Sequence, residues 1–420
     1  MNTDLPNPRP AGLVRRALLA LALSSLAALA PAQPMAAAHH DHASHGRAGC
    51  TTTDLACASA VTPFIDAQGT LWIAWSAGGA VSVARSSDGA RSFGPAVVVG
   101  RHGAALDVGA DARPQIVVDA AGRVIVAYGV FKDKAYNAQV LVATSLDGGA
   151  SFSMPRSLSA DGASQRFPAL AVRDGDGALF ATWLDKRTVA AARRNGGKQP
   201  GAALAYAWSR DGGRSFGVEK IAADHTCECC RLAVAFDAQH HPVVLFRSIY
   251  GTRERDHAVL TFDDAGNAGA PRRVAIDRWE IDGCPHHGPA VAVAGDGSYQ
   301  AAWFTLGQLR QGLFYARSTD QGRSFSPPQA VGDPEQQPGR PYLLARGQTV
   351  WLVWKEFDGK RIFIKARRSP DAGRSWSADR VVADTGAYAD HPLLVGDAQH
   401  VYLSWLTRDE GYRLIALDDR

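Results

Sequence analysis

Short apolar runs alternate with turn residues along the chain from about residue 61 onward. The runs are four to seven residues long, rich in Val, Ala, Leu and aromatic residues, and bounded by Gly, Asp and Asn. No 3.6-residue period is sustained, so the pattern predicts β-strands joined by tight turns. A typical repeating unit holds four such runs, of which the second ends in an aromatic residue.

This unit recurs seven times. Its opening runs are residues 63–65, 114–116, 168–170, 231–233, 289–291, 341–343 and 392–394. The aromatic residues of the second runs are Trp75, Tyr128, Trp183, Phe246, Trp303, Trp354 and Trp405. Four-stranded sheets repeated radially form a β-propeller. We therefore predict an all-β propeller of four-stranded blades, with seven blades, or six if one terminal unit is extra.

The phrase Ser-x-Asp-x-Gly-x-Ser-Phe/Trp keeps a constant phase with these units. Its Asp residues are Asp88, Asp147, Asp211, Asp320 and Asp371, with Ala90 in place of Gly in the first copy. An incomplete copy at residues 263–266 fills the longest gap. Asp and Ser side chains can hydrogen-bond the backbone of a turn, and Gly supplies a positive φ. We expect a structural turn between the third and fourth strands of each blade. The alternative is a binding site for a ligand or calcium.

The two ends of the chain differ from the repeats. Arg15 and Arg16 precede an apolar stretch, and residues 30–32 read Ala-Pro-Ala, which predicts a signal peptide over residues 1–32 and a periplasmic or secreted protein. The stretch is too short to span a membrane, so no span is expected in the mature chain. Residues 33–60 are expected to form a His-rich linker and an N-terminal segment that closes the ring. The propeller is expected over residues 61–420.

The net charge and the composition of the linker add two indications about possible partners. The net charge is +4 over 420 residues, and no basic stripe with interleaved aromatic residues is present, which argues against a nucleic-acid partner. The linker contains His39, His40, His42 and His45, which is a metal-ligand composition. The alternative is a solvated linker.

The repeat phase also predicts where unusual side chains converge. In a propeller, the residue before each opening run lies on the same face as the loop after the second run. The residues at these positions are Thr62, Arg113, Phe167, Cys230, Gly288, Arg340 and His391. A funnel with converging polar groups is the default ligand site, so we expect a metal ion or a small anionic or glycan ligand there.

Six cysteines fall into two groups. Cys50 and Cys57 are placed for a local disulfide. The other group is Cys227, Cys229 and Cys230 in a Cys-x-Cys-Cys phrase, together with Cys284, His286 and His287 of the next unit. Neighbouring thiols and imidazoles suit copper or zinc. Disulfides that staple units four and five are the alternative, and the two can coexist.

The five Asp motifs resemble the Asp-boxes, or BNR repeats, of the sialidase superfamily from about Thr62 onward. The resemblance implies a propeller fold. Sialidases clamp a substrate carboxylate with three Arg, attack with a Tyr activated by a Glu, and use an Asp as acid and base. The residues of this chain that match are Arg166, Asp185, Glu228, Arg247, Arg340 and Tyr388.

This set departs from the family pattern in its order. The family places its Arg-Ile-Pro signature in the first blade, whereas here the similar Arg166 lies only one unit before Glu228. The loop 189–204 holds no acidic residue, which leaves Asp185 as the acid/base candidate. We therefore expect an incomplete catalytic set, and whether the chain is an enzyme stays open.

A looser similarity is to exported Asp-box proteins that carry Thr-Cys-x-Cys-Cys and Gly-Cys-Pro-x-x-Gly-Pro between blades. This similarity favours the cysteine cluster as a unit. Three hypotheses follow. The protein binds a thiophilic metal, with copper first. Alternatively, it is an exo-sialidase or related glycoside hydrolase. In the third hypothesis it is a disulfide-stapled adhesion or scaffold module.

Overall fold

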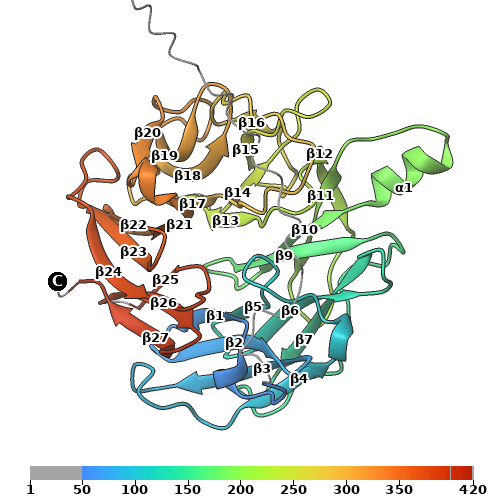
Figure 1. Ribbon diagram of the computed structural model, residues 1–420. Coiled ribbons are helices and arrows are strands. Elements are labelled where there is room, and N and C mark those ends of the chain that lie inside the picture. The colour runs from blue at the N-terminus through green and yellow to red at the C-terminus, as the bar shows by residue number, and fades with distance from the viewer. Residues whose placement is uncertain (1–49, 398, 419–420) are drawn as a thin grey trace, which may run out of the picture. The chain divides into compact units, whose positions relative to one another are not determined.

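The computed structural model describes residues 50–397 and 399–418. Within them the chain forms seven antiparallel sheets, arranged radially as the blades of a propeller (Figure 1). The prediction of an all-β, seven-bladed propeller is confirmed. The signal peptide predicted over residues 1–32 and the histidines of residues 39–45 lie outside the described residues.

The first three blades follow the chain order. The first comprises β1 (Ala60–Ile65), β2 (Leu71–Ala77), β3 (Ala80–Ser86) and β4 (Val97–Arg101). The second comprises β5 (Gln115–Val118), β6 (Val124–Phe131), β7 (Ala138–Ser145) and β8 (Arg156–Ser157). The third comprises β9 (Gln165–Val172), β10 (Leu179–Asp185), β11 (Ala202–Ser209) and β12 (Lys220–Thr226).

The remaining four blades continue the same order. The fourth comprises β13 (Ala233–Phe236), β14 (Pro242–Arg247), β15 (His257–Thr261) and β16 (Arg272–Arg273). The fifth comprises β17 (Ala290–Val293), β18 (Tyr299–Leu306), β19 (Gln311–Ser318) and β20 (Gln329–Val331). The sixth comprises β21 (Gly339–Arg346), β22 (Thr349–Phe357), β23 (Ile362–Ser369) and β24 (Arg380–Thr385). The seventh comprises β25 (Leu393–Gly396), β26 (Val401–Thr407) and β27 (Gly411–Ala416).

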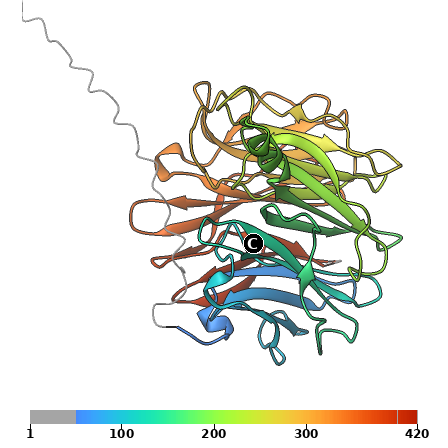
Figure 2. The same cartoon turned by 90° about the vertical axis from the view of Figure 1, so that its right-hand side faces the viewer.

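Helical segments are few in the part of the chain that the structure describes. Three short 3-10 helices are η1 (Leu55–Cys57), η2 (Gly103–Ala105) and η3 (Pro334–Gln336). The α-helix α1 (Arg187–Arg194) lies in the β10–β11 connection; it projects at the edge of the blades in Figure 1 and lies in front of them in Figure 2. The sequence pattern suggested only a loop there, but three consecutive alanines and two arginines in the last turn favour a helix. No helix within residues 50–397 and 399–418 is long and apolar enough to cross a membrane.

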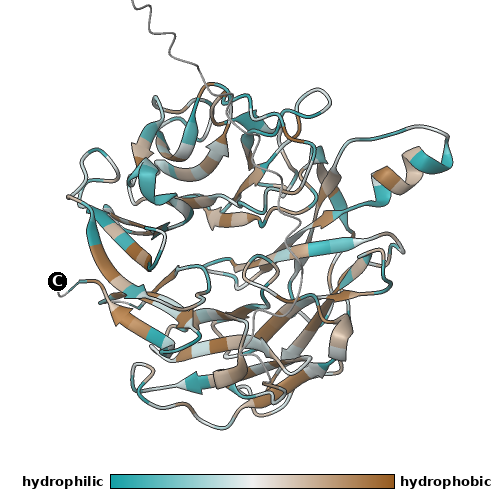
Figure 3. Cartoon of the chain, in the orientation of Figure 1, coloured by the Kyte–Doolittle hydropathy of each residue, from teal (hydrophilic) through white to brown (hydrophobic). Residues whose placement is uncertain are grey.

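The antiparallel order gives each blade two different ends. Connections between blades and the turns between second and third strands lie at one end, which we call the loop end. Turns between first and second strands and between third and fourth strands lie at the other, which we call the turn end. The hydrophobic residues concentrate in the strands and the hydrophilic residues in the connections (Figure 3).

The second strand of every blade buries its predicted aromatic residue. Trp75, Tyr128, Trp183, Phe246, Trp303, Trp354 and Trp405 are each at most 1% exposed. Each packs against the blade before it: Trp183 lies in one apolar cluster with Ile125 of β6, and Trp75 shares a cluster with Leu406 of β26. The packing between blades therefore continues from the seventh blade to the first and closes the ring.

Ring closure also uses one buried ion pair. Arg113 precedes β5, and its guanidinium donates to both carboxylate oxygens of Asp390 at 2.6 and 3.2 Å. Arg113 also donates to the carbonyl of Val61 in β1, while the backbone N–H of Val61 donates to Asp390. Three blades, the first, second and seventh, thus meet at a single clamp.

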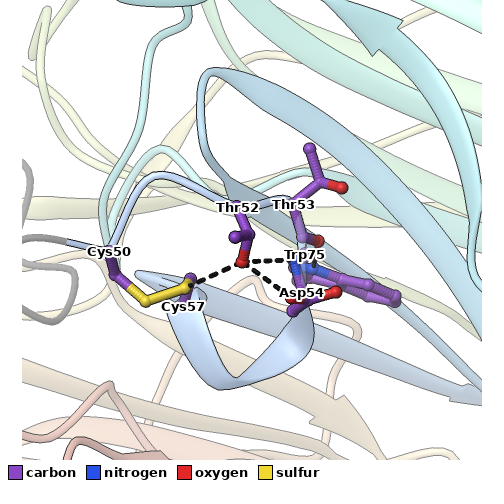
Figure 4. Close-up of a disulfide and its surroundings, with 6 residues drawn as sticks. All are labelled: Cys50, Thr52, Thr53, Asp54, Cys57 and Trp75. Carbon is purple, nitrogen blue, oxygen red and sulfur yellow. Dashed lines mark hydrogen bonds between the residues drawn. A yellow bond between two sulfur atoms is a disulfide. The ribbon is translucent and has the colours of Figure 1, made fainter.

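The N-terminal segment packs where the ring closes, but within the described residues it adds no fourth strand to the seventh blade, which departs from the expected four-stranded pattern. Cys50 and Cys57 form the predicted disulfide (Figure 4), which packs in the cluster shared by the first and last blades. The indole N–H of Trp75 donates to the carbonyl of Thr53 at 2.9 Å. Among the described residues, η1 lies against β27, where the three-stranded seventh sheet ends.

The Asp motifs form turns at the turn end, as predicted. In each copy the first Ser ends the third strand and its hydroxyl donates to the Asp. The same carboxylate accepts from the backbone N–H and the hydroxyl of the second Ser, at 2.9 and 2.5 Å for Asp147 and Ser151. In the incomplete copy, Asp263 accepts from the backbone N–H of Asn267 instead. The carboxylates are thus occupied by their own turns.

These turns should make the fold sensitive to strong acid. The second Ser of each motif lowers the pKa of Asp147, Asp320 and Asp371 to about 2, from about 3.9 in the unfolded chain. Their contribution to the free energy of unfolding is therefore complete above about pH 5 and is lost as the pH falls through about 4 towards 2.

Urea unfolding measured between about pH 5 and pH 2.5 tests this dependence. A variant with Ser151→Ala, Ser324→Ala and Ser375→Ala should be less stable at the higher pH and should lose less stability on acidification. Parallel curves for the two proteins would show that the Asp turns do not cause the acid sensitivity.

Candidate functional site

The cysteine phrase occupies the connection between the third and fourth blades, at the loop end. Its backbone is fixed to β14, because the N–H of Cys227 donates to the carbonyl of Arg247 at 2.9 Å and the N–H of Ile249 donates to the carbonyl of His225 at 2.6 Å. Cys227, Cys229 and Cys230 are at most 2% exposed and belong to the apolar cluster between these two blades. Three thiols are therefore held in a dry and rigid setting.

A second connection, from β16 to β17, brings Cys284 and His286 to the same place. Three guanidinium groups hold its backbone. Arg255 donates to the carbonyl of Ile281 at 3.1 Å, and Arg247 donates to the carbonyl of His287 at 3.0 Å. Arg340 donates to the carbonyl of His286, whose φ of 51° is left-handed. The segment 281–287 is thus fixed across the cysteine phrase.

The ligand atoms of these two connections form two groups. The Sγ atoms of Cys227, Cys229 and Cys230 all lie within 4.8 Å of one another, with 2.9 Å between Cys227 and Cys230. The ligand atoms of Cys229, Cys284 and His286 also lie within 4.8 Å of one another. A disulfide needs a separation of about 2.05 Å, and all four cysteines are free thiols. The cluster can hold a metal ion.

Charge in the cluster concentrates on one sulfur. Burial raises the pKa of Cys227, but thiol hydrogen bonds from Cys229 and Cys230 and the charges of Arg255 and Arg247 outweigh burial and hold that pKa well below its usual value. The pKa of Cys229 is raised because it donates to Cys227, and burial raises the pKa of Cys230. Among the three buried thiols, deprotonation is therefore most favoured at Cys227, beside two guanidinium groups.

His287, which the sequence placed with the metal ligands, lies in neither group. Its ring stacks on Phe304 with 4.0 Å between centroids. Burial and the charge of Arg340 keep the pKa of His287 well below its usual value, so the ring is neutral. The structure therefore brings together five of the six candidate metal ligands.

A second polar group surrounds Asp111 near the mouth of the channel. Arg340 pairs with the carboxylate at 3.1 Å, and His391 lies 3.5 Å from it. Burial raises the pKa of Asp111, but Arg340 and His391 outweigh burial and hold it well below its usual value. Asp111 also lines a cavity of about 130 Å³ among the inner strands, together with Arg113, Arg231 and Tyr342.

Cations outnumber carboxylates around this cavity. Burial lowers the pKa of Arg231 to about 10, and burial with the nearby Arg340 lowers the pKa of Lys355 to about 8. The Nε atom of Arg231 has no hydrogen-bond partner among the described residues. Such a setting can accept an anion.

The candidate hydrolase residues all lie at the loop end, but three of them are engaged elsewhere. Arg166 makes a bidentate pair with Asp107 at 2.8 and 3.0 Å. Arg247 donates to three backbone carbonyls and stacks over Trp279 at 4.4 Å. Asp185 is fully buried and accepts from the Trp183 indole and from Arg187.

The other three candidates are nearer to exposed or cavity positions. The carboxylate of Glu228 pairs with Lys186 at 2.5 Å beside the cysteine phrase. Arg340 faces Asp111, as described above. Burial raises the pKa of Tyr388, and the charges of Asp390 and Arg113 are the next largest influences on it. Tyr388 and Arg340 therefore belong to the same charged region of the funnel.

Sequence reasoning missed Arg255, which holds the segment 281–287, and two carboxylates that pair with candidate arginines. Arg255 lies in the β14–β15 connection, and Asp111 and Asp107 lie in the β4–β5 connection. The repeat phase places both connections at the loop end, so the location of these residues could have been predicted. Their contacts could not, because the partners are distant in sequence: Asp111 and Arg340 are 229 positions apart in the chain.

Comparison with known proteins supports the fold. No protein-family model matches the chain. No curated protein matches it either. Among solved structures, an ulvan lyase of polysaccharide lyase family PL25 is similar, with 11% identity, a TM-score of 0.56, and coverage of 86% of this chain and 93% of the lyase. The polysaccharide lyase Uly1 has 10% identity and a TM-score of 0.54, with 86% of this chain and 88% of that chain covered.

A sialidase is also among the similar structures. The Hadza microbial sialidase Hz136 has 14% identity and a TM-score of 0.49, over 82% of this chain and 76% of its own. The similarity to the two polysaccharide lyases supports the propeller fold alone.

Proposed function

Starting from a seven-bladed propeller of the sialidase-like type, we propose that this protein binds a thiophilic metal ion, copper as Cu(I), at its loop end. The observation that supports the proposal most is the convergence of four free thiols and His286 from two neighbouring blade connections. Three of the thiols are buried in an apolar cluster that excludes water. A bound metal ion would supply these sulfurs with the polar partner that water does not.

The chemistry of the ligands favours copper over zinc. Thiolates are soft ligands and select Cu(I), which accepts low coordination numbers. Structural zinc sites are almost always closed tetrahedra of four ligands, whereas the buried group here offers three sulfurs, Cys227, Cys229 and Cys230. Zinc is therefore the competitor to test, with copper expected to bind more tightly.

We further propose that the protein is exported. The apolar stretch before residues 30–32 supports this proposal. The disulfide between Cys50 and Cys57 supports it independently, because disulfides persist in oxidising compartments. N-terminal sequencing of the cell-fractionated protein tests it: a mature chain starting at Gln33 supports export, and an intact Met1 contradicts it.

Anaerobic titration with Cu(I) against a competing chelator tests the metal proposal. Wild-type protein is expected to retain copper, and the double variant Cys229→Ser/Cys230→Ser is expected to lose it, because the buried group then keeps only one of its three sulfurs. The double variant Cys50→Ser/Cys57→Ser removes the same number of cysteines far from the cluster and should retain copper. Equal copper in all three proteins would overturn the proposal.

The disulfide-stapled scaffold makes the opposite prediction about the cysteines. It requires that denatured, unreduced protein show no reactive thiols. The structure instead supports four, because only Cys50 and Cys57 are bridged. A thiol titration in denaturant distinguishes the two.

One observation favours a second candidate function, binding or hydrolysis of an anionic glycan. Arg113 and Arg231 line the cavity in the channel together with Asp111, and Arg340 pairs with the same carboxylate. A fluorogenic sialoside assay tests turnover. Activity that is present in the wild type and absent in Tyr388→Phe would support a sialidase, whereas no activity leaves glycan binding to be tested by titration with a sugar acid.

A further inference from the structure

We propose that the cluster is built for two monovalent metal ions that share the thiolate of Cys229. This inference rests on the proposed function and extends it from a metal site to a dinuclear centre. Cys229 is the one residue common to both groups of converging ligand atoms. A thiolate sulfur has lone pairs enough to bind two soft ions, so the two groups can be filled at the same time.

The inner ion would be held by three sulfurs. Cys227, Cys229 and Cys230 lie on one short turn and are at most 2% exposed. Their Sγ atoms are 2.9 Å apart for Cys227 and Cys230 and 3.8 Å apart for Cys227 and Cys229. Small changes in the distances between these Sγ atoms would give a trigonal sulfur site around an ion, which suits Cu(I) or Ag(I).

The outer ion would be held by Cys229, Cys284 and His286. These ligands come from two different connections and meet because Arg340, Arg247 and Arg255 hold the segment 281–287 in place. His286 takes a left-handed backbone conformation, an arrangement that costs energy in a non-glycine residue and often accompanies a function. Cys284 is exposed, so this second position opens to solvent and provides the route of entry.

The two positions should differ in exchange. The inner ion would have three sulfur ligands that are each at most 2% exposed. The outer ion has an exposed ligand, so an external chelator reaches it first. We expect stepwise loss, with the outer ion removed readily and the inner ion removed slowly.

Metal counting on the full mature protein tests the inference. Anaerobic loading with Cu(I), followed by desalting and elemental analysis, should give two ions per chain in the wild type. The double variant Cys284→Ser/His286→Ala should give one, because the inner site is intact. His240→Ala is the matched control: it removes a histidine that also has a positive φ but lies at the turn end, and it should keep two ions.

The outcomes separate the two proposals. No retained copper in the wild type overturns metal binding itself. One ion in both the wild type and the Cys284→Ser/His286→Ala variant overturns the dinuclear centre and leaves single-ion binding standing. Two ions in both overturns the outer ligand set. X-ray absorption of the loaded wild type gives an independent readout, since a shared thiolate requires a metal–metal scattering path that the variant lacks.

Discussion

Replacing Arg113 with Gln is expected to lower the free energy of unfolding by about 3–5 kcal/mol, because the change leaves a buried carboxylate without its counter-charge. Asp390 is 2% exposed, and burial raises its pKa despite the nearby Arg113. Burying the pair therefore costs free energy, and removing only one partner costs more. Because the first, second and seventh blades meet at this pair, the substitution weakens the closure of the ring.

Chemical denaturation of single and double variants checks this expectation. The Arg113→Gln/Asp390→Asn variant removes both charges and should be clearly more stable than Arg113→Gln alone. Arg361→Gln breaks an exposed pair with Asp384 and serves as the control, with an expected loss of at most about 1 kcal/mol. A double variant that is less stable than either single variant would contradict the account.

Replacing Arg247 with Met is expected to cost about 3–5 kcal/mol of unfolding free energy, since three buried carbonyl groups each lose a charged donor. The carbonyls belong to Arg255, His287 and Phe304, so the change also frees the segment that holds Cys284 and His286. We therefore expect the same variant to retain less copper in the outer position. The substitution should thus have two distinct effects, a lower free energy of unfolding and a lower copper content.

Two measurements separate these effects. Denaturation reports the stability change, and copper counting at a temperature where the variant is folded reports the site. Arg368→Met is the matched control, because Arg368 lies over the Trp351 ring at 5.4 Å but is exposed, and it should change neither quantity appreciably. Full copper retention in folded Arg247→Met would show that this arginine does not position the outer ligands.

The repeats made most of the fold predictable. The blade number, the burial of Trp75 and its six counterparts, and the turns around Asp147 and its relatives follow from residues within one unit. Such contacts are local, so sequence spacing is enough to place them. The Cys50–Cys57 disulfide was predictable for the same reason.

The candidate site was predictable in location but not in contacts. The repeat phase placed Arg166, Arg247 and Arg340 at one end of the blades. It could not show that Arg166 is paired with Asp107, or that Arg247 binds carbonyl groups, because those partners come from other blades. The sequence does not distinguish an arginine that binds a substrate carboxylate from one that donates to backbone carbonyl groups. The thiol state of Cys227 and its neighbours also depends on distances between connections.

The separation of each blade into a turn end and a loop end has an evolutionary consequence. The Asp turns complete their hydrogen bonds within eight residues at one end, whereas the cysteine cluster depends on connections at the other. Substitutions at the two ends share no contacts, so their effects on stability should add. The loop end can then acquire or lose chemistry while the Asp turns at the other end stay intact.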